Sequence, residues 1–138
     1  MKLFNRNLLP ILLLLATPHV LADGVVVIGH PSLQKLDAVT LQKIYTGKII
    51  EVNGNAISAV NLISGNASRS QFLAAYLGQD EEKYQAYWTV RKFIGKGSPP
   101  KELASSAEVI EFVQSQAGAI GYIDVGALKQ GLNVLNRR

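Results

Sequence analysis

The sequence of 138 residues contains no cysteine and only two histidines. Without thiols the chain can form no disulfide framework and no thiolate metal site, and it has no cysteine nucleophile. His19 belongs to the N-terminal segment, so His30 is the only histidine of the remaining chain. One imidazole beside a proline is typical of a polar residue at the exit of a strand, and we predict neither a metal site nor a cofactor.

Catalytic motifs are missing as well. The chain has no G-x-S-x-G segment and no phosphate-binding P-loop motif. The consecutive acids Asp80, Glu81 and Glu82 stand where a helix is predicted to begin, and there they compensate the helix dipole instead of facing one reaction centre. We therefore expect that the protein is not an enzyme.

The N-terminal segment has the pattern of an export signal. Two basic residues precede an apolar run from Leu8 to Ala16, and Val20-Leu21-Ala22 follows with small residues at the cleavage positions. The run is shorter than the about 20 residues that a membrane span needs, which disfavours the alternative of an uncleaved anchor. We predict a signal peptide over residues 1–22, cleavage after Ala22, a periplasmic location and no membrane insertion once the signal is removed.

The charge balance of the remaining chain is weak. The sequence has 14 basic and 10 acidic residues, and removal of Lys2 and Arg6 leaves 12 against 10. Only Arg137-Arg138 forms a basic run, so we predict no nucleic-acid partner. Residues 23–138, about 116 in number (138 less 22), have the length of one domain.

Strand and helix patterns alternate along this domain. Val25 to Ile28 is a continuous β-branched run, typical of a strand buried on both faces. Helix-capping residues separate the other apolar segments, and the alternation predicts an α/β domain with a mixed sheet and helices on both faces. The predicted strands cover residues 25–28, 57–62, 119–123 and 132–135, and the predicted helices are capped by Thr40, Ser68, Asp80 and Ser105. The aromatic residues Tyr84, Tyr87 and Trp88 are at helical spacing, which favours burial in the core over a partner surface.

The loop from Ser64 to Ser70 is the best candidate for a binding site. The first N–H groups of a helix lack internal partners and attract anions. Gly65 allows close approach of the backbone, Ser64, Ser68 and Ser70 supply hydroxyls, and Arg69 supplies a charged fork suited to phosphate or carboxylate. Taken alone, the same pattern also fits an ordinary capped helix whose arginine points into water.

Three segments, in this order and spacing, resemble the phosphate-binding proteins of high-affinity phosphate uptake systems. They are the helix and turn T-L-Q-K-I-Y-T-G-K-I at 40–49, the strand, loop and helix start at 59–72, and A-G-A-I-G-Y at 117–122. The resemblance implies a type 2 periplasmic-binding-protein-like fold. Full-size members close two lobes over phosphate, whereas this chain has the length of one, so the resemblance implies a short, single-lobe form.

In that family a strand-end arginine and a Ser-Gly-Thr loop contact the anion. Here Ser64 stands at the place of that arginine, Ser68 and Ser70 match the loop hydroxyls, and Arg69 replaces the loop glycine. The resemblance implies that phosphate or a related oxyanion binds at Ser64, Gly65, Ser68, Arg69 and Ser70, for phosphate transport with an ABC permease or beside a membrane sensor. The alternative is a non-transport periplasmic interaction or sensor-accessory module that has lost ligand binding.

Overall fold

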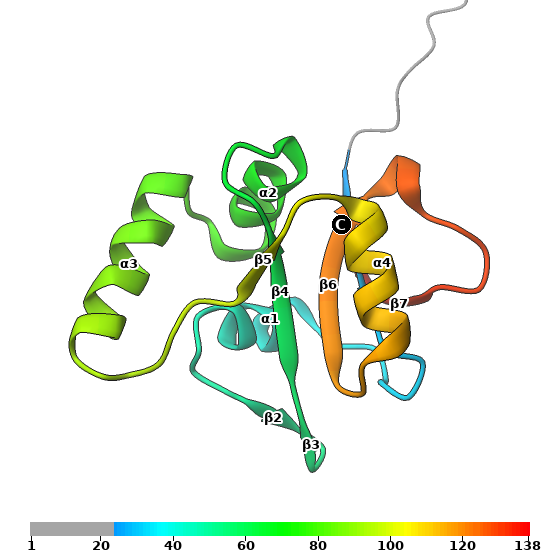
Figure 1. Cartoon of the computed structure of the whole chain (residues 1–138), viewed down its shortest axis with the longest axis horizontal. Coiled ribbons are helices and arrows are strands. Elements are labelled where there is room, and N and C mark those ends of the chain that lie inside the picture. Colours follow the sequence, from blue (N-terminus) through cyan, green and yellow to red (C-terminus); the bar gives the residue numbers. More distant parts are fainter. Residues whose placement is uncertain (1–23) are drawn as a thin grey trace, which may run out of the picture.

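The β-branched run near the start of the domain lies inside the sheet. The computed structural model describes residues 24–138, and the predicted signal peptide and its cleavage site lie outside the described residues. Within 24–138 the five-stranded sheet has the order β5-β4-β6-β1-β7 (Figure 1). Its strands are β1 (Val25–Gly29), β4 (Ser58–Leu62), β5 (Lys101–Leu103), β6 (Ala119–Asp124) and β7 (Asn133–Arg137).

The sheet is mixed, as the sequence predicted. β1 pairs antiparallel with both β6 and β7, whereas β4 pairs parallel with both β5 and β6. A separate two-stranded hairpin consists of β2 (Glu51–Val52) and β3 (Asn55–Ala56). Its turn is formed by Asn53 and Gly54, whose φ angles of 50° and 80° lie in the left-handed region that asparagine and glycine tolerate best.

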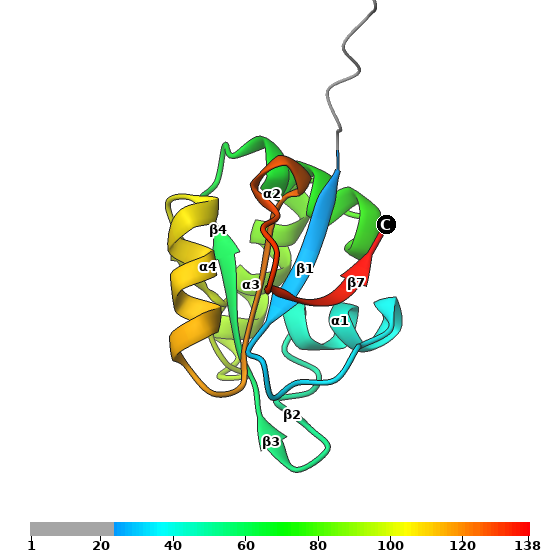
Figure 2. The same cartoon turned by 90° about the vertical axis from the view of Figure 1, so that its right-hand side faces the viewer.

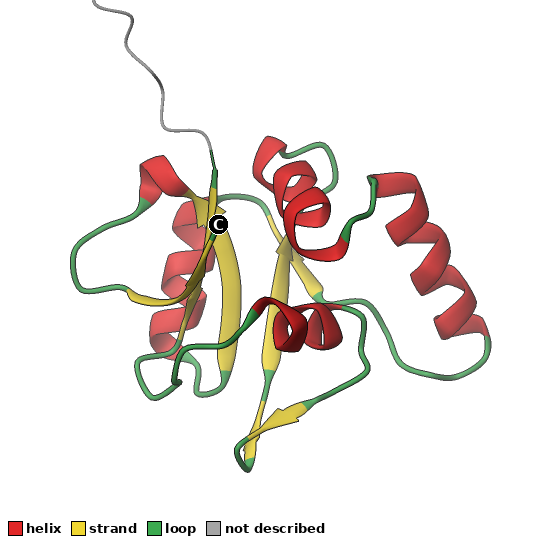
Figure 3. Cartoon of the chain, turned by 180° about the vertical axis from the view of Figure 1, so that it is seen from behind, coloured by secondary structure: helices red, strands yellow, loops and turns green. Residues whose placement is uncertain are grey.

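Helices cover both faces of the sheet. Figure 2 shows α4 on one side of the strands and α1 and α2 on the other. The helical elements are α1 (Ala38–Tyr45), α2 (Ala67–Phe72), the π-helical turn η1 (Leu73–Leu77), α3 (Glu81–Phe93), α4 (Ser106–Ser115) and the 3₁₀ turn η2 (Val125–Ala127). Seen from behind in Figure 3, α3 stands at the outer edge of the molecule, beyond the β5 end of the sheet.

Two of the predicted helix caps are confirmed and two are displaced. Asp80 and Ser105 each accept a hydrogen bond from the backbone N–H three residues on. Thr40 is not a cap, because Asp37 starts α1 earlier and accepts the Thr40 N–H at 2.7 Å. For α2 the cap is Asn66, whose side chain accepts the Ser68 N–H at 2.9 Å. Both helices begin earlier because Asp and Asn are strong capping residues.

The core forms where β1 and β6 meet the helices. β1 is buried along its whole length, and on β6 the side chains of Ile120, Tyr122 and Ile123 are fully enclosed. At Gly121 an added Cβ would lie 2.4 Å from Cγ1 of Val109, so the missing side chain lets α4 pack directly on the strand. None of the helices described between residues 24 and 138 is long and apolar enough to cross a membrane.

Candidate functional site

The candidate loop connects the end of β4 to the start of α2. β4 ends at Leu62, and Ser64 and Gly65 follow as exposed residues before the Asn66 cap. Gly65 has a φ of 89°, a conformation that side chains disfavour, so the turn itself requires glycine. The loop therefore presents its backbone to solvent at the point where the chain turns into the helix.

Several hydrogen-bond donors of this loop are not used by the protein. Among residues 24–138, the backbone N–H groups of Ser64, Gly65 and Ala67 donate no hydrogen bond to the protein. The Ser64 hydroxyl accepts a 3.4 Å hydrogen bond from Gln85, and it also interacts with Glu81, whose pKa it helps to lower. Backbone N–H groups at the start of a helix, together with hydroxyls, are the donors that bind oxyanions.

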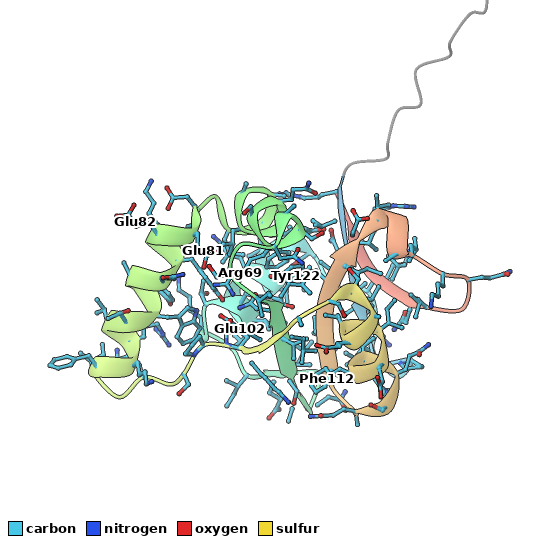
Figure 4. All side chains as sticks on the ribbon, turned by 45° about the horizontal axis from the view of Figure 1, so that its top comes forward. Arg69, Glu81, Glu82, Glu102, Phe112 and Tyr122 are labelled. Carbon is cyan, nitrogen blue, oxygen red and sulfur yellow. The ribbon has the colours of Figure 1, made fainter. Side chains whose placement is uncertain are left out.

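The Arg69 side chain is turned into the protein, and it is only 3% exposed. Nε and Nη2 donate to the two carboxylate oxygens of Glu81 at 2.8 and 2.6 Å, and Nη1 donates to Glu102 and to the Leu62 carbonyl, each at 2.9 Å. Four of the five guanidinium N–H groups are thus engaged, and Figure 4 shows Arg69 with Glu81 and Glu102 on either side.

The charges of this cluster stabilise one another. Burial alone would lower the pKa of Arg69, but the hydrogen bonds from Arg69 to Glu81 and Glu102 outweigh it and the pKa is raised. For Glu81, desolvation would raise the pKa, yet the hydrogen bonds from Arg69 and Gln85 and the arginine charge lower it below its usual 4.5. Arg69 is therefore charged and Glu81 ionised at neutral pH.

A network of aromatic hydroxyls lies beneath the arginine. The Tyr122 hydroxyl donates to the Asn61 side chain at 3.1 Å and accepts the Leu62 N–H at 3.1 Å. Asn61 in turn donates to the Tyr84 hydroxyl at 3.0 Å, and the Arg69 guanidinium lies 5.6 Å from the Tyr84 ring centre. Burial raises the pKa of Tyr122, so it is a neutral hydrogen-bonding group. The network fixes the end of β4, where the candidate loop begins.

The cluster also borders a cleft beside α3. A cavity of about 220 Å³ lies next to Arg69 and Glu102, between α3 and the chain leading into β5. The other lining residues are Tyr84, Gln85, Trp88, Thr89, Lys92 and Pro99. Glu102 is 48% exposed, compared with 28% for Glu81, so Glu102 is the partner of Arg69 that solvent reaches more easily.

The five residues predicted for the site thus divide into two groups. Ser64, Gly65 and Ser70 are exposed, and Ser68 is 8% exposed at the first turn of α2. Arg69 faces inward between two carboxylates that the sequence argument did not assign to the site. The sequence predicts only dipole compensation for Glu81, and it assigns no role to Glu102. No local signal in the sequence points to this cluster, because Glu81 and Glu102 stand 12 and 33 residues from Arg69.

Comparisons with known proteins identify the fold. No protein-family model matches the sequence, and no match to the curated proteins was found. Solved structures do match. One, from Clostridium perfringens, is described as a phosphate ABC transporter substrate-binding protein with bound phosphate, and it is 23% identical with a TM-score of 0.64. PstS from Borrelia burgdorferi is 24% identical with a TM-score of 0.62. An ABC-type phosphate transport receptor from Vibrio cholerae is 16% identical with a TM-score of 0.58.

The chain has a phosphate-binding-protein-like fold. Each alignment covers 83% of this chain but only 44%, 47% and 46% of the Clostridium, Borrelia and Vibrio proteins, respectively. The aligned part of the chain therefore spans less than half the length of these proteins. This agrees with the predicted single-lobe architecture. Among residues 24–138 no group of three or more His, Asp or Glu side chains is placed to hold a metal ion.

Proposed function

We propose that the domain is a periplasmic, single-lobe solute-binding-like protein that recognises phosphate or a related oxyanion at the loop from Ser64 to Ser70, in the service of ABC transport. The observation that carries the proposal is the group of backbone N–H donors at Ser64, Gly65 and Ala67, which no acceptor among the described residues satisfies. The fold supports it, because one matching structure was solved with phosphate bound.

Arg69 joins this site by exchanging one of its partners. Glu102 already holds Nη1 in the way that an oxyanion would, through a charge-assisted hydrogen bond of 2.9 Å. An incoming oxyanion takes that place when the half-exposed Glu102 side chain swings out, whereas Glu81 keeps its bidentate contact. Binding is weak in this mechanism, because the anion competes with a carboxylate and the site is open to water.

The exchange mechanism makes a specific calorimetric prediction. With phosphate at low salt, the Glu102→Gln variant should bind more tightly than the parent, because the competing negative charge is removed. Glu111→Gln is the matched control. Glu111 is an exposed acid on α4, so this substitution removes the same charge at a different place. Ser64→Ala and Ser70→Ala should each weaken binding. No heat and no thermal stabilisation at millimolar phosphate, in the parent and in Glu102→Gln, would contradict the proposal.

A second function is favoured by the same arginine. Four of its five N–H groups are bound within the protein, and the two carboxylates add negative charge beside the loop. A domain with such an internally neutralised site fits an interaction or sensor-accessory module that has lost ligand binding. The titration separates the two functions, because the module predicts no phosphate response in either the parent or Glu102→Gln.

A further inference from the structure

The C-terminal end of α3 carries large apolar side chains that nothing in the described chain covers. Phe93 is 90% exposed, Val90 is 59% exposed and Ile94 is 54% exposed. These three residues, with Lys92 and Lys96, are called the α3 tip below. The tip lies at the outer edge of the molecule in Figures 1 and 3. Isolated exposed apolar residues are common, but three within five positions form a patch.

The same segment is strongly basic. From Gln85 to Lys101 the sequence contains four basic residues and no acid. Arg91 is used internally, because its guanidinium lies over the rings of Tyr87 and Trp88 and donates to the Gly47 carbonyl. Within residues 24–138, the only ion pairs are those of Arg69, so the lysines at 92, 96 and 101 are not neutralised by a carboxylate.

Helix stability explains only part of this arrangement. Positive charge in the last turn of a helix interacts favourably with the helix dipole, which accounts for Arg91 and Lys92. It does not account for Lys96 and Lys101, which follow the helix, or for an almost fully exposed Phe93. The tip is also separate from the oxyanion loop, since Glu81 and Phe93 stand twelve residues apart on α3, which is about 18 Å along a helix.

We propose that the α3 tip docks on an anionic phospholipid surface. Phe93, Val90 and Ile94 enter the headgroup region, while Lys92 and Lys96 contact lipid phosphates. We infer an anionic surface as the binding partner because the α3 tip is positively charged and contains no acidic residue. The small size of the patch also favours a membrane over a protein partner. Three side chains bury far less than the about 800 Å² per partner of a specific protein interface. A membrane surface needs only a small apolar anchor with basic residues around it.

The experiment is vesicle flotation with the chain from Gly24 to Arg138, which contains every helix and strand described. The N-terminal apolar run is left out because it would itself partition into lipid. Vesicles of phosphatidylglycerol and phosphatidylcholine in equal parts should bind the protein, and pure phosphatidylcholine should bind it much less. The Lys92→Glu/Lys96→Glu variant should lower the partition coefficient at least about 30-fold, and Phe93→Ser should lower it roughly tenfold.

Matched controls separate the tip from general charge and hydrophobicity. Lys35→Glu/Lys129→Glu changes the net charge equally at exposed positions outside the tip, and Val39→Ser removes an apolar side chain that is 58% exposed on α1. Both should bind like the parent. Equal losses in the controls and the tip variants would overturn the proposal. Absence of binding at any phosphatidylglycerol content would also overturn it, and would point to an acidic protein surface as the occupant.

A second measurement tests insertion directly. The only tryptophan, Trp88, is 5% exposed, so a tryptophan placed at position 93 by Phe93→Trp gives a distinct fluorescence signal. Lipids with brominated acyl chains should quench this signal on binding and leave Trp88 of the parent almost unchanged. Binding without quenching at position 93 would overturn the insertion of the tip. The inference does not depend on the oxyanion site.

Discussion

The two long helices of the molecule are attached to the sheet by different physical means. α4 packs on the sheet with aliphatic side chains, and its buried residues are Val109, Ile110 and Val113. α3 buries only Tyr84 and Trp88, and it is otherwise held by polar contacts such as Glu81 with Arg69. α4 is thus held mainly by aliphatic packing, whereas α3 combines two buried aromatic side chains with an ion pair and hydrogen bonds.

This difference predicts how each attachment fails. Apolar packing responds to changes of volume and hardly to pH or salt. A buried ion cluster responds to protonation and to the loss of one partner, because the remaining charge is then uncompensated. We expect α3 to detach in local openings at lower free energy than those that separate α4 from the sheet.

Removing the central cation should cause the largest loss. The Arg69→Met variant keeps an unbranched side chain but leaves Glu81 and Glu102 facing each other without a counter-charge, and it removes a donor from the Leu62 carbonyl. We expect the free energy of unfolding to fall by about 3 kcal/mol, measured by urea denaturation at neutral pH. Arg137→Met at an exposed position is the control and should be near neutral. An unchanged stability of Arg69→Met would show that the cluster does not hold α3.

Adding one methyl group should disturb the α4 side. In Gly121→Ala the new Cβ would meet Cγ1 of Val109 at 2.4 Å and Cγ2 of Val60 at 3.1 Å. We expect a loss of about 2 kcal/mol from overpacking. The double variant Gly121→Ala/Val109→Ala should lose less than the sum of the single variants, because the second change makes room for the first. Strict additivity would mean that the contact between β6 and α4 is not the cause.

Most of the sheet on which α4 packs was predictable from the sequence. The strands at 25–28, 57–62 and 119–123 were found within one or two residues, because β-branched and alternating apolar runs identify buried strands well. β5 was missed, since Lys101–Leu103 is short and follows two prolines, and only its pairing with β4 makes it a strand. Local pattern identifies elements that bury their own apolar side chains, and it misses those that depend on a neighbour.

The attachment of α3 was predicted less well for the same reason. The capped helix and the burial of Tyr84 and Trp88 were correct, and Tyr87 is half-buried. The inward turn of Arg69 was not foreseen, because its partners stand 12 and 33 residues further along the chain. A charge cluster of this kind has no periodicity, and only the folded arrangement brings its members together.

Acid should weaken the α3 attachment selectively. The pKa of Glu81 is lowered in the folded protein, so the folded state binds fewer protons, and the stability from this group is present above pH 4.5 and lost as the pH falls below it. Urea denaturation from about pH 7 to about pH 3.5 should show this loss. Glu81→Gln should be less stable at neutral pH by about 1.5 kcal/mol and should lose less on acidification. An identical pH dependence in parent and variant would contradict this role.

We expect the smallest effect from removing a single hydrogen bond between α3 and α1. The Tyr87 hydroxyl donates to the Thr46 carbonyl at 2.7 Å, which ties the middle of α3 to the end of α1. Tyr87→Phe removes this bond and keeps the ring beside Trp88 and Arg91, so we expect a loss of about 0.5–1 kcal/mol. Hydrogen exchange should then speed up in α3 and stay unchanged in α4, because the lost bond belongs to one attachment only. Faster exchange in both helices would instead mean that α3 and α4 open together, and that the contrast between them does not extend to dynamics.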